Sequence, residues 1–393
     1  MDEQRPVRES FLPFSRPTIG DDEIAEVMES MRSGWITTGP KVARLEELFS
    51  EWSGGQQAIA VNSATSGLHL ALAALDLKPG DEVITTPITW PSTVNNIEIC
   101  GAQPIFADVC KDTLQIDPGE VERRITARTR AVVPVHFAGA PCDLDPLREI
   151  CDARGIRLLE DAAHAVGTAY KGRLVGSDSD AAVFSFHPIK NMTTGEGGMV
   201  LCRSPEMAER MRRLRFHGIS RDAWKRYAKG GSPQYEVYEP GFKYNMLDLM
   251  AAIGLHQFKR LEEFNARRKV LAENYLRLFA EVPQIQPLGQ ALYAHHHAWH
   301  LFVVRVEIDA LSIDRDQFLS ALQEENIGVG LHFPAVHLQK FYREKYGFRC
   351  GDFPNAEWNS DRILSLPLYP LLTEADQRDV AAAVNKIVAR HRC

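Results

Sequence analysis

The sequence contains no C-x-x-C pair, and its seven cysteines are an odd number. In a chain of 393 residues this pattern argues against a disulfide framework and favours reduced thiols in the cytosol. We therefore expect a cytoplasmic protein. The cysteines are Cys100, Cys110, Cys142, Cys151, Cys202, Cys350 and Cys393.

Long apolar runs are also missing. The most apolar long window, residues 59–77, is interrupted by Asn62, Ser63 and His69 and is therefore too polar to cross a bilayer. The first ten residues are charged and have no apolar core, so we expect no signal peptide. We expect residues 1–10 to form a dispensable tail and the protein to have no membrane partner.

The sequence has no excess of basic residues, because 45 lysines and arginines stand against 52 aspartates and glutamates. Nucleic-acid binding would need a basic face, so a net charge of -7 predicts no nucleic-acid partner. Metal-ligand spacings and internal repeats are absent as well. The three histidines at 295–297 have no cysteine or carboxylate at ligand spacing, so we interpret them as a polar loop and expect no metal site.

The first 200 residues alternate short apolar runs with helix-length segments. The runs are rich in Val, Ile and Phe and are often bounded by Gly, Pro or Asp, which is typical of buried strands. Strands that alternate with helices predict an α/β fold, with a mainly parallel seven-stranded sheet and one antiparallel strand near its end. The expected strands are 57–63, 82–87, 104–109, 131–137, 157–163, 181–187 and 198–203, and the helices between them are 66–75, 91–100, 117–125 and 143–153.

The pattern changes after residue 245. Residues 246–279 form one long helical pattern of the kind that links a large domain to a smaller one. A strand over 300–308 and helices over 313–325 and 373–390 follow. We predict a large α/β domain at 12–260 and a smaller α+β C-terminal domain at 261–393.

A lysine follows the sixth expected strand in the loop SFHPIKNMTTGEGG, residues 185–198. A partly desolvated lysine in such a loop can form a Schiff base with a carbonyl cofactor, because burial and nearby positive charge favour its neutral amine. Glycines in the loop let the backbone pass close to a ligand. The alternative for Lys190 is an ordinary solvated loop lysine.

Glu160 and Asp161 end the fifth expected strand, in LLEDAAHAVG at 158–167. A carboxylate there can pair with a protonated pyridine nitrogen and keep the ring an electron sink. His164 follows one turn later, where it would contact a ring hydroxyl. Asp161 alone is equally compatible with a helix N-cap. Together with Lys190 it marks one sheet edge, where α/β proteins bind ligands.

Two further features accompany these residues. A Ser/Thr-rich turn precedes a helix, and its free N–H groups form an anion site where Thr65 and Ser66, with Ser185, would hold a phosphate. Trp90 follows another strand end and offers a flat face for stacking on a pyridine ring. Simple helix capping and a buried core aromatic are the respective alternatives.

The motif set resembles the DegT/DnrJ/EryC1/StrS family of sugar aminotransferases from residue 11 nearly to the C-terminus. This resemblance implies a type I pyridoxal-phosphate-dependent transferase fold, with pyridoxal 5'-phosphate as the cofactor. The motifs are SGWITTGP (33–40), NSATSGLH (62–69), EDAAHAVGTAYKG (160–172), FSFHPIKNMTTGEGG (184–198), FHG (216–218) and PGFKYNMLDLMAAIGLHQ (240–257).

By this resemblance, Lys190 would carry the cofactor and Asp161 would pair with the pyridine nitrogen. His164 stands where the wider family more often has Gln. Asn245 would reach the phosphate from the neighbouring subunit, so that a homodimer shares its active sites. The remaining implied contacts are Thr65, Ser66, Trp90 and Ser185 with the cofactor, and Thr37, Thr38 and His332 with the sugar nucleotide.

Segments 297–306, 328–344 and 357–370 resemble one branch, the UDP-4-amino-4-deoxy-L-arabinose–oxoglutarate aminotransferases of lipid A modification. That branch implies L-glutamate as donor, 2-oxoglutarate as by-product and a UDP-linked 4-keto-pentose as acceptor. The lysine loop, with Pro188, is also typical of enzymes that aminate 6-deoxy-hexoses. A UDP-, dTDP- or GDP-linked hexose acceptor therefore stays open. A sugar dehydratase, which would replace Lys190 by histidine, and an inactive scaffold, which would lose one of these groups, are further alternatives.

Overall fold

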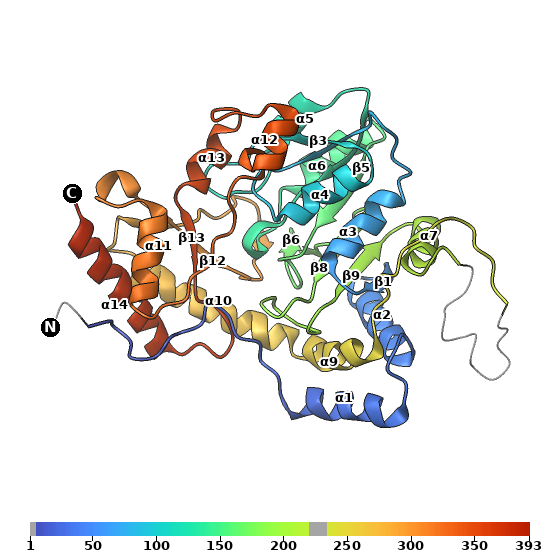
Figure 1. Cartoon of the computed structure of the whole chain (residues 1–393), viewed down its shortest axis with the longest axis horizontal. Helices are drawn as coiled ribbons and strands as arrows, with labels where there is room; N and C mark the ends of the chain where they lie inside the picture. Colours follow the sequence, from blue (N-terminus) through green and yellow to red (C-terminus); the bar gives the residue numbers. More distant parts are fainter. Residues whose placement is uncertain (1–4, 220–233) are drawn as a thin grey trace.

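Seven strands form the main sheet of the computed structural model, which describes residues 5–219 and 234–393 (Figure 1). The strand order is β1-β9-β8-β5-β4-β2-β3, and every neighbouring pair is parallel except the two that involve β9. The predicted mainly parallel sheet with one antiparallel strand is confirmed. The strands are β1 (Gln57–Val61), β2 (Glu82–Thr85), β3 (Gln103–Phe106), β4 (Thr129–Val133), β5 (Arg157–Asp161), β8 (Ala181–Ser185) and β9 (Gly198–Cys202).

Alternate residues of these strands enter different cores, as the two-residue period of a strand requires. Ala131 and Val133 of β4 pack with α3, α4 and α7, whereas Val132 packs on the opposite face with α5 and α6. Helices α2 and α9 continue that second face over β1, β8 and β9. The helices are α1 (Asp21–Ser33), α2 (Pro40–Trp52), α3 (Ala64–Ala73), α4 (Pro91–Ile99), α5 (Pro118–Arg124), α6 (Leu144–Asp152), α7 (Pro205–Arg215) and α9 (Asp248–Lys259).

Each predicted strand extends at least one residue past the C-terminal end of the observed strand. The strand predicted over 82–87 ends at Thr85, and the one predicted over 131–137 ends at Val133. Several of the excess residues are buried and apolar, Ala107, Val135 and Phe186 among them, but they lie in the loops that follow the strands. Local pattern cannot separate such buried loops from strand, because both exclude water.

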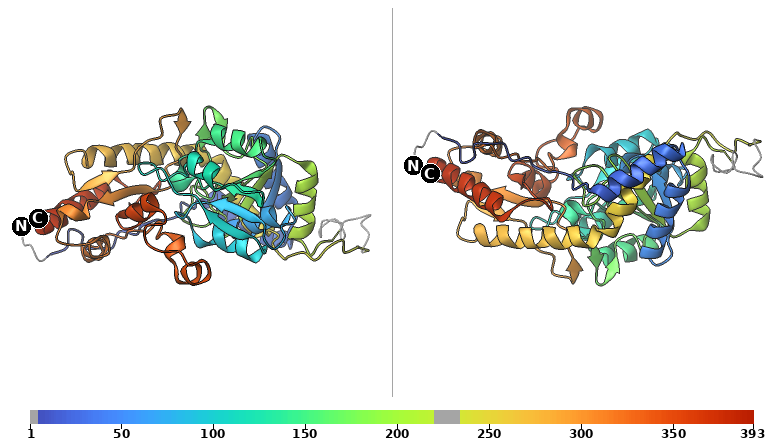
Figure 2. Two further views of the ribbon diagram at one scale, coloured as in Figure 1. Left: turned by 90° about the horizontal axis from the view of Figure 1, so that it is seen from above. Right: turned by 90° about the horizontal axis from the view of Figure 1, so that it is seen from below.

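A second, three-stranded antiparallel sheet has the order β10-β12-β13. It packs with α10, α11 and α14 around a separate core. Figure 2 shows α10 running lengthwise from the region of the large sheet to this smaller one. The strands of this sheet are β10 (Ile285–Pro287), β12 (Phe302–Val306) and β13 (Ile363–Leu366), and its helices are α10 (Leu261–Leu278), α11 (Arg315–Glu324) and α14 (Glu374–His391). The other elements of the chain include α12 (Lys340–Tyr346), α13 (Pro354–Ser360) and the short η1 (Phe137–Gly139), η2 (Ile308–Ala310) and η3 (Val336–Leu338).

The prediction of a single long helix over 246–279 is wrong, since α9 and α10 are separate helices that meet at Arg260. Arg260 has φ -98° and ψ 2°, outside the helical region, and its N–H donates to the carbonyl of Gln257. The three-residue hydrogen bond interrupts the helical ladder, which begins again from the Arg260 carbonyl. The domain division at 260/261 stays a prediction.

The histidine run is also not a loop. His295 and His296 form β11, which pairs with β6 (Ala169–Tyr170), and β6 pairs in turn with β7 (Arg173–Leu174). Among the described residues no cluster of His, Cys, Asp or Glu has the arrangement of a metal site. In the same part of the chain, no helix combines the length and apolarity that crossing a membrane requires.

The N-terminal extension is not a free tail where the structure describes it. Arg8 forms ion pairs with Asp376 at 2.8 Å and Asp379 at 2.5 Å on α14, and the N–H of Val7 donates to Glu325 at 2.6 Å. The described N-terminal segment and the C-terminus lie at the same end of the molecule, beside α14 (Figure 1). Charged residues that look like a solvated tail in sequence thus have partners far along the chain.

Candidate active site

A cavity of about 420 Å³ lies at the carboxyl edge of the large sheet. Most of its walls come from the loops that follow β1, β2, β4, β5 and β8, which all end at this edge. Ligands of α/β proteins bind at such edges. The lining residues include Thr65, Trp90, Asp161, His164, Ser185, Lys190 and His332, all of which the sequence predicts as site residues.

Asp161 ends β5 and is 5% exposed. Its Oδ2 accepts the Thr93 hydroxyl at 2.6 Å, and its Oδ1 accepts the N–H of Ala163 at 3.1 Å. Burial raises the pKa of Asp161, and the two hydrogen bonds oppose that rise. Both donors are neutral, so the carboxylate is oriented by hydrogen bonds but lacks a hydrogen-bonded cation among the described residues.

Lys190 lies in the loop after β8, and its backbone N–H donates to the His187 carbonyl at 2.9 Å. Its amine Nζ is 3.4 Å from Nε2 of His300. Burial lowers the pKa of Lys190 to about 7; the charge of Asp161 opposes this shift and that of Arg268 adds to it. A substantial fraction of the amine is therefore neutral near pH 7, as a nucleophile or base requires.

Helix α3 starts at the cavity wall. Ser63 caps it by accepting the N–H of Ser66 at 3.1 Å. Thr65 is exposed and lines the cavity, as does Ser185 at the end of β8. The Ser66 hydroxyl instead donates to Oδ1 of Asn62 at 2.6 Å. The free N–H groups and the positive dipole end of this helix form an anion site.

Two rings flank the cavity. Trp90 is 60% exposed and lies 5.9 Å, between ring centroids, from Phe333. His164 is buried, and its Nδ1 accepts the N–H of Ala138 at 3.3 Å, so the ring is fixed in orientation. Burial lowers the pKa of His164 well below its ordinary range, and the ring is therefore neutral at physiological pH.

His332 closes the cavity from segment 331–333. Its Nδ1 is 2.9 Å from the Ser365 hydroxyl, and its ring stacks on Phe14 at 5.4 Å. Burial lowers the pKa of His332 to about 3, so this imidazole also carries no charge. The N-terminal segment therefore contributes to the site through Phe14, which packs against the His332 ring.

Four other predicted residues do not line this cavity, namely Ser66, Thr37, Thr38 and Asn245. Thr38 is buried, donates to the Met246 carbonyl at 2.5 Å and accepts from Nδ2 of Asn245 at 2.6 Å. Thr37 is exposed, and its carbonyl accepts the N–H of Asp248 at 3.0 Å. Thr37, Thr38 and Asn245 form their own cluster, which does not line the cavity of the same chain.

Sequence reasoning missed Thr93, His300 and Phe333. Trp90 is the N-cap residue of α4, and Thr93 lies three residues later in the first turn of the helix. Residues three positions apart are neighbours on a helix surface, so both lie at the start of α4. His300 belongs to the segment 297–306 and Phe333 to 328–344. Their proximity to Lys190 and Trp90 depends on long-range packing, for which the sequence carries no local signal.

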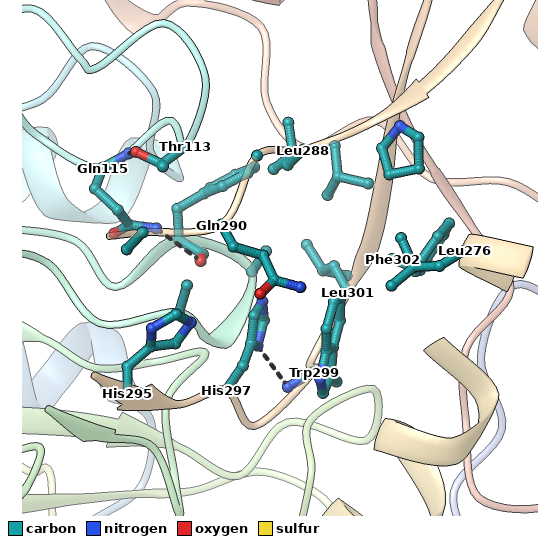
Figure 3. Close-up of a pocket in the computed structure, with 17 residues that line it drawn as sticks. Thr113, Gln115, Leu276, Leu288, Gln290, His295, His297, Trp299, Leu301 and Phe302 are labelled. Atoms are coloured by element: carbon teal, nitrogen blue, oxygen red, sulfur yellow. Dashed lines mark hydrogen bonds between the residues drawn. The ribbon is translucent and has the colours of Figure 1, made fainter. Parts of the chain in front are cut away.

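A second, smaller cavity of about 40 Å³ is lined in part by His295 and His297 (Figure 3). Its walls are mostly apolar, with Leu276, Leu288 and Leu301 among them, and Gln115, Gln290, His295 and His297 supply polar groups. Lys190 and Asp161 do not line it. The space suits a few water molecules and is too small for a metabolite.

The main cavity fits pyridoxal phosphate. Asp161 is a buried carboxylate for which a protonated pyridine nitrogen would supply the cation. Trp90 exposes an aromatic face, and the start of α3 is suited to a phosphate. Lys190 lines the same cavity with an amine whose pKa is close to neutrality.

Comparison with known proteins gives a consistent result. Residues 17–385 match the model of a family described as the DegT/DnrJ/EryC1/StrS aminotransferase family. A putative sugar aminotransferase, Spr1654 from Streptococcus pneumoniae, solved in its PMP-form, is 33% identical with a TM-score of 0.90, over 96% of this chain and 99% of that one. The same protein in its PLP-form is 32% identical with a TM-score of 0.89, over 97% and 99% of the two chains.

Two further solved structures are similar. PseC of Helicobacter pylori, an aminotransferase involved in the biosynthesis of pseudoaminic acid, is 27% identical with a TM-score of 0.90, over 97% of this chain and 100% of that one. DesV of S. venezuelae, in complex with a ketimine intermediate, is 34% identical with a TM-score of 0.85, over 95% and 98%.

Proposed function

Since the chain belongs to the DegT/DnrJ/EryC1/StrS aminotransferase family and is a type I, pyridoxal-phosphate-dependent sugar aminotransferase, we propose that it moves the amino group of L-glutamate to C4 of a UDP-linked 4-keto-sugar. A UDP-4-keto-pentose is the proposed acceptor. The products would be 2-oxoglutarate and UDP-4-amino-4-deoxy-L-arabinose. This product would serve lipid A modification, a branch of lipopolysaccharide biosynthesis, from the cytoplasm.

One observation carries the assignment of the catalytic pair. Lys190 and Asp161 are 29 positions apart by their numbering, yet they line one cavity at the ends of β5 and β8, which are adjacent strands. One is an amine with its pKa lowered to about 7 and the other a buried carboxylate. We assign Lys190 as the residue that binds the cofactor and transfers protons, and Asp161 as the partner of its pyridine nitrogen.

When bound, pyridoxal phosphate supplies an electron sink next to the carbon that loses a proton. Lys190 would take up that proton at Nζ and return it to the neighbouring position, because its neutral amine is available near pH 7. Thr93 and Ala163 hold the Asp161 carboxylate in one orientation. Thr65 and Ser66 at the start of α3, with Ser185 at the end of β8, would hold the phosphate. Trp90 would stack on the ring, and His164 would contact its hydroxyl.

The acceptor assignment draws support from the cavity wall. Two segments that resemble the arabinose branch supply His332 and Phe333 to the wall and His300 to the neighbourhood of Lys190. We assign His332, with Thr37 and Thr38, to sugar-nucleotide contacts. The loop around Pro188 favours the rival acceptor class, the nucleotide-linked 4-keto-6-deoxy-hexoses.

We also propose a homodimer in which Asn245 of one subunit reaches the phosphate in the other. Helix α1 supports this proposal with an apolar stripe in which Ile24 is 51%, Met28 43% and Met31 63% exposed. Their spacing of four and three residues puts them on one face of the helix, and contiguous exposed apolar faces mark interfaces. Thr38 lies near the end of the loop that follows α1, and Asn245 donates to its hydroxyl at 2.6 Å.

The decisive experiment is a panel of nucleotide keto-sugars with L-glutamate as donor, read out by formation of the amino sugar in mass spectrometry. The proposal predicts that the UDP-4-keto-pentose gives a kcat/KM at least tenfold above any hexose. Preference for a UDP-, dTDP- or GDP-linked hexose would replace the acceptor but keep the reaction. Failure of glutamate alone to convert the bound cofactor to its amino form would exclude glutamate as donor.

A further inference from the structure

Among the described residues, the side chain of His300 comes within hydrogen-bond reach of the Lys190 amine. Its Nε2 lies 3.4 Å from Nζ, a long contact of the kind that tightens when a site is occupied. His300 immediately precedes Leu301, whose N–H donates to the Ala138 carbonyl at 3.2 Å. The backbone carbonyl of His300 accepts from Arg268 at 3.1 Å. The ring is therefore attached to a fixed stretch of backbone.

The surroundings of this ring keep it uncharged. His300 is 2% exposed, and its ring packs on that of His164 with centroids 4.4 Å apart. Burial is the largest cause that lowers the pKa of His300 well below its ordinary range. The charged or titratable groups that face the ring act in the same direction, and they are Lys190, His164, Arg268 and His332.

A neutral imidazole has one N–H, so one ring nitrogen is a donor and the other an acceptor. Nδ1 of His300 is buried and has no hydrogen-bond partner within the described chain. A buried N–H without a partner is costlier and rarer in proteins than a buried acceptor without one. The lower-energy tautomer therefore leaves Nδ1 bare and places the proton on Nε2, which faces Lys190.

This choice of tautomer discriminates between the two forms of Lys190. A neutral amine has a lone pair and accepts a hydrogen bond from the Nε2–H. An ammonium has donors alone, so it would force the proton of His300 onto the unpartnered Nδ1. A hydrogen bond to the neutral form of a group favours that form.

We propose that His300 is a positioning residue that donates its Nε2–H to the uncharged amine of Lys190 and thereby favours amine over ammonium. The inference deepens the proposed function, on which its significance rests, because Lys190 needs a lone pair whenever it is not joined to the cofactor. The proton of His300 stays on Nε2 while Lys190 is uncharged, and no net proton transfer to or from the ring takes place.

The test measures the titration of Lys190 in the full chain freed of cofactor. Trace acetylation with acetic anhydride between pH 5 and 10, followed by mass spectrometry of the Lys190 peptide, gives the midpoint. The wild-type midpoint is expected at about 7. His300→Gln, whose amide oxygen accepts from an ammonium, is expected to raise the midpoint by about one pH unit, the size of one hydrogen bond.

His297→Gln is the matched control, because it makes the same change three residues upstream. His297 lines the small cavity of Figure 3 and accepts the N–H of Trp299 at 2.8 Å. Its midpoint is expected to equal that of the wild type. A folded His300→Gln variant with an unchanged midpoint would mean that His300 only fills space, and would overturn the proposal.

A second measurement needs no variant. Trp299–His300 is the only Trp-His pair in the sequence, so a chain labelled with ¹³C-carbonyl tryptophan and ¹³C,¹⁵N-histidine identifies the His300 amide and, through the carbons of the same residue, its ring nitrogens. The proposal predicts a protonated Nε2 and a bare Nδ1 from pH 8 to 9, where Lys190 is mainly uncharged. A proton on Nδ1, or on both nitrogens, contradicts it. Neither readout depends on the sugar acceptor or on turnover, so failure here is distinguishable from failure of the proposed reaction.

Discussion

Thr93 donates its hydroxyl to Oδ2 of Asp161 at 2.6 Å, although 68 residues separate them. The same hydroxyl oxygen is 2.9 Å from that of Thr89, so a short chain of hydroxyl groups ends at the carboxylate. All three residues are almost completely buried. The hydrogen bond opposes the rise in the pKa of Asp161 that burial causes, and thus favours the charged form.

Replacing this donor tests its role. Thr93→Val is expected to raise the pKa of Asp161 further and to reduce kcat by about tenfold, because a hydrogen bond to a charged group contributes about 1.5–3 kcal/mol. Thr168→Val is the control, since it removes another buried hydroxyl, bonded to the Gly139 carbonyl at 2.7 Å. Equal losses of kcat in the two variants would show that Thr93 acts through stability alone.

Asp161→Asn tests the cost of the buried carboxylate. Because the folded chain raises the pKa of Asp161 above 3.8, the unfolded chain loses this proton first as the pH rises. The cofactor-free protein therefore loses stability as the pH climbs from about 3.8 through the folded pKa. Asp161→Asn is expected to raise the Tm of the cofactor-free chain at pH 7 while lowering kcat at least a hundredfold. Thermal scans at pH 4 and pH 7 check the sign, and a Tm of Asp161→Asn below that of the wild type at pH 7 contradicts the prediction.

Arg268 is a buried cation close to Lys190. Its Nη1 donates to the carbonyls of His300 at 3.1 Å and Leu368 at 2.9 Å. Its charge contributes to the lowered pKa of Lys190, so Arg268→Met is expected to move the Lys190 titration midpoint upward from about 7. Arg268→Lys, which keeps the charge, should move it less. An unchanged midpoint in a folded Arg268→Met chain would show that the charge of Arg268 does not lower the pKa of Lys190.

The apolar stripe on α1 makes the proposed dimer testable. Met31→Glu puts a charge among Ile24 and Met28 and is expected to halve the mass in light scattering and to weaken cofactor binding at least tenfold. Asp22→Lys, an exposed change on another face of the same helix, is the control. A wild-type monomer with full cofactor occupancy would contradict the shared site.

The contacts of Arg8 predict that the N-terminal extension contributes to stability. Arg8→Ala is expected to lower the free energy of unfolding by about 1 kcal/mol, since the pairs with Asp376 and Asp379 are partly buried. Arg44→Ala, whose pair with Glu47 is exposed, should change it by less than Arg8→Ala does. Urea denaturation measures both, and an equal effect of the two changes would contradict the prediction.

Local pattern was sufficient for much of the fold. The strands and the helices between them follow from runs of β-branched residues and from Pro, Asp and Ser at helix starts, as at Pro91 and Asp117. Local pattern was insufficient where contacts between distant parts of the chain determine the structure. The pairing of His295 with Tyr170 and that of Arg8 with Asp376 join residues more than a hundred positions apart, and no local rule predicts them.

The site shows the same division. Residues that end a strand, such as Asp161 and Ser185, were predictable, because parallel strands bring their ends to one edge. Thr93 and His300 were not, since they reach Asp161 and Lys190 from a helix and from the second sheet region. The roles of the predicted residues toward the cofactor stay predictions.

The most direct test of the account is to locate the cofactor on the chain. The purified protein is treated with borohydride, which fixes a lysine-bound pyridoxal phosphate as a stable secondary amine, and its peptides are mapped by mass spectrometry. The account predicts the added mass on Lys190, yellow colour before reduction, and neither in Lys190→Ala. The added mass on a different lysine, or a colourless protein that binds no cofactor, would contradict it.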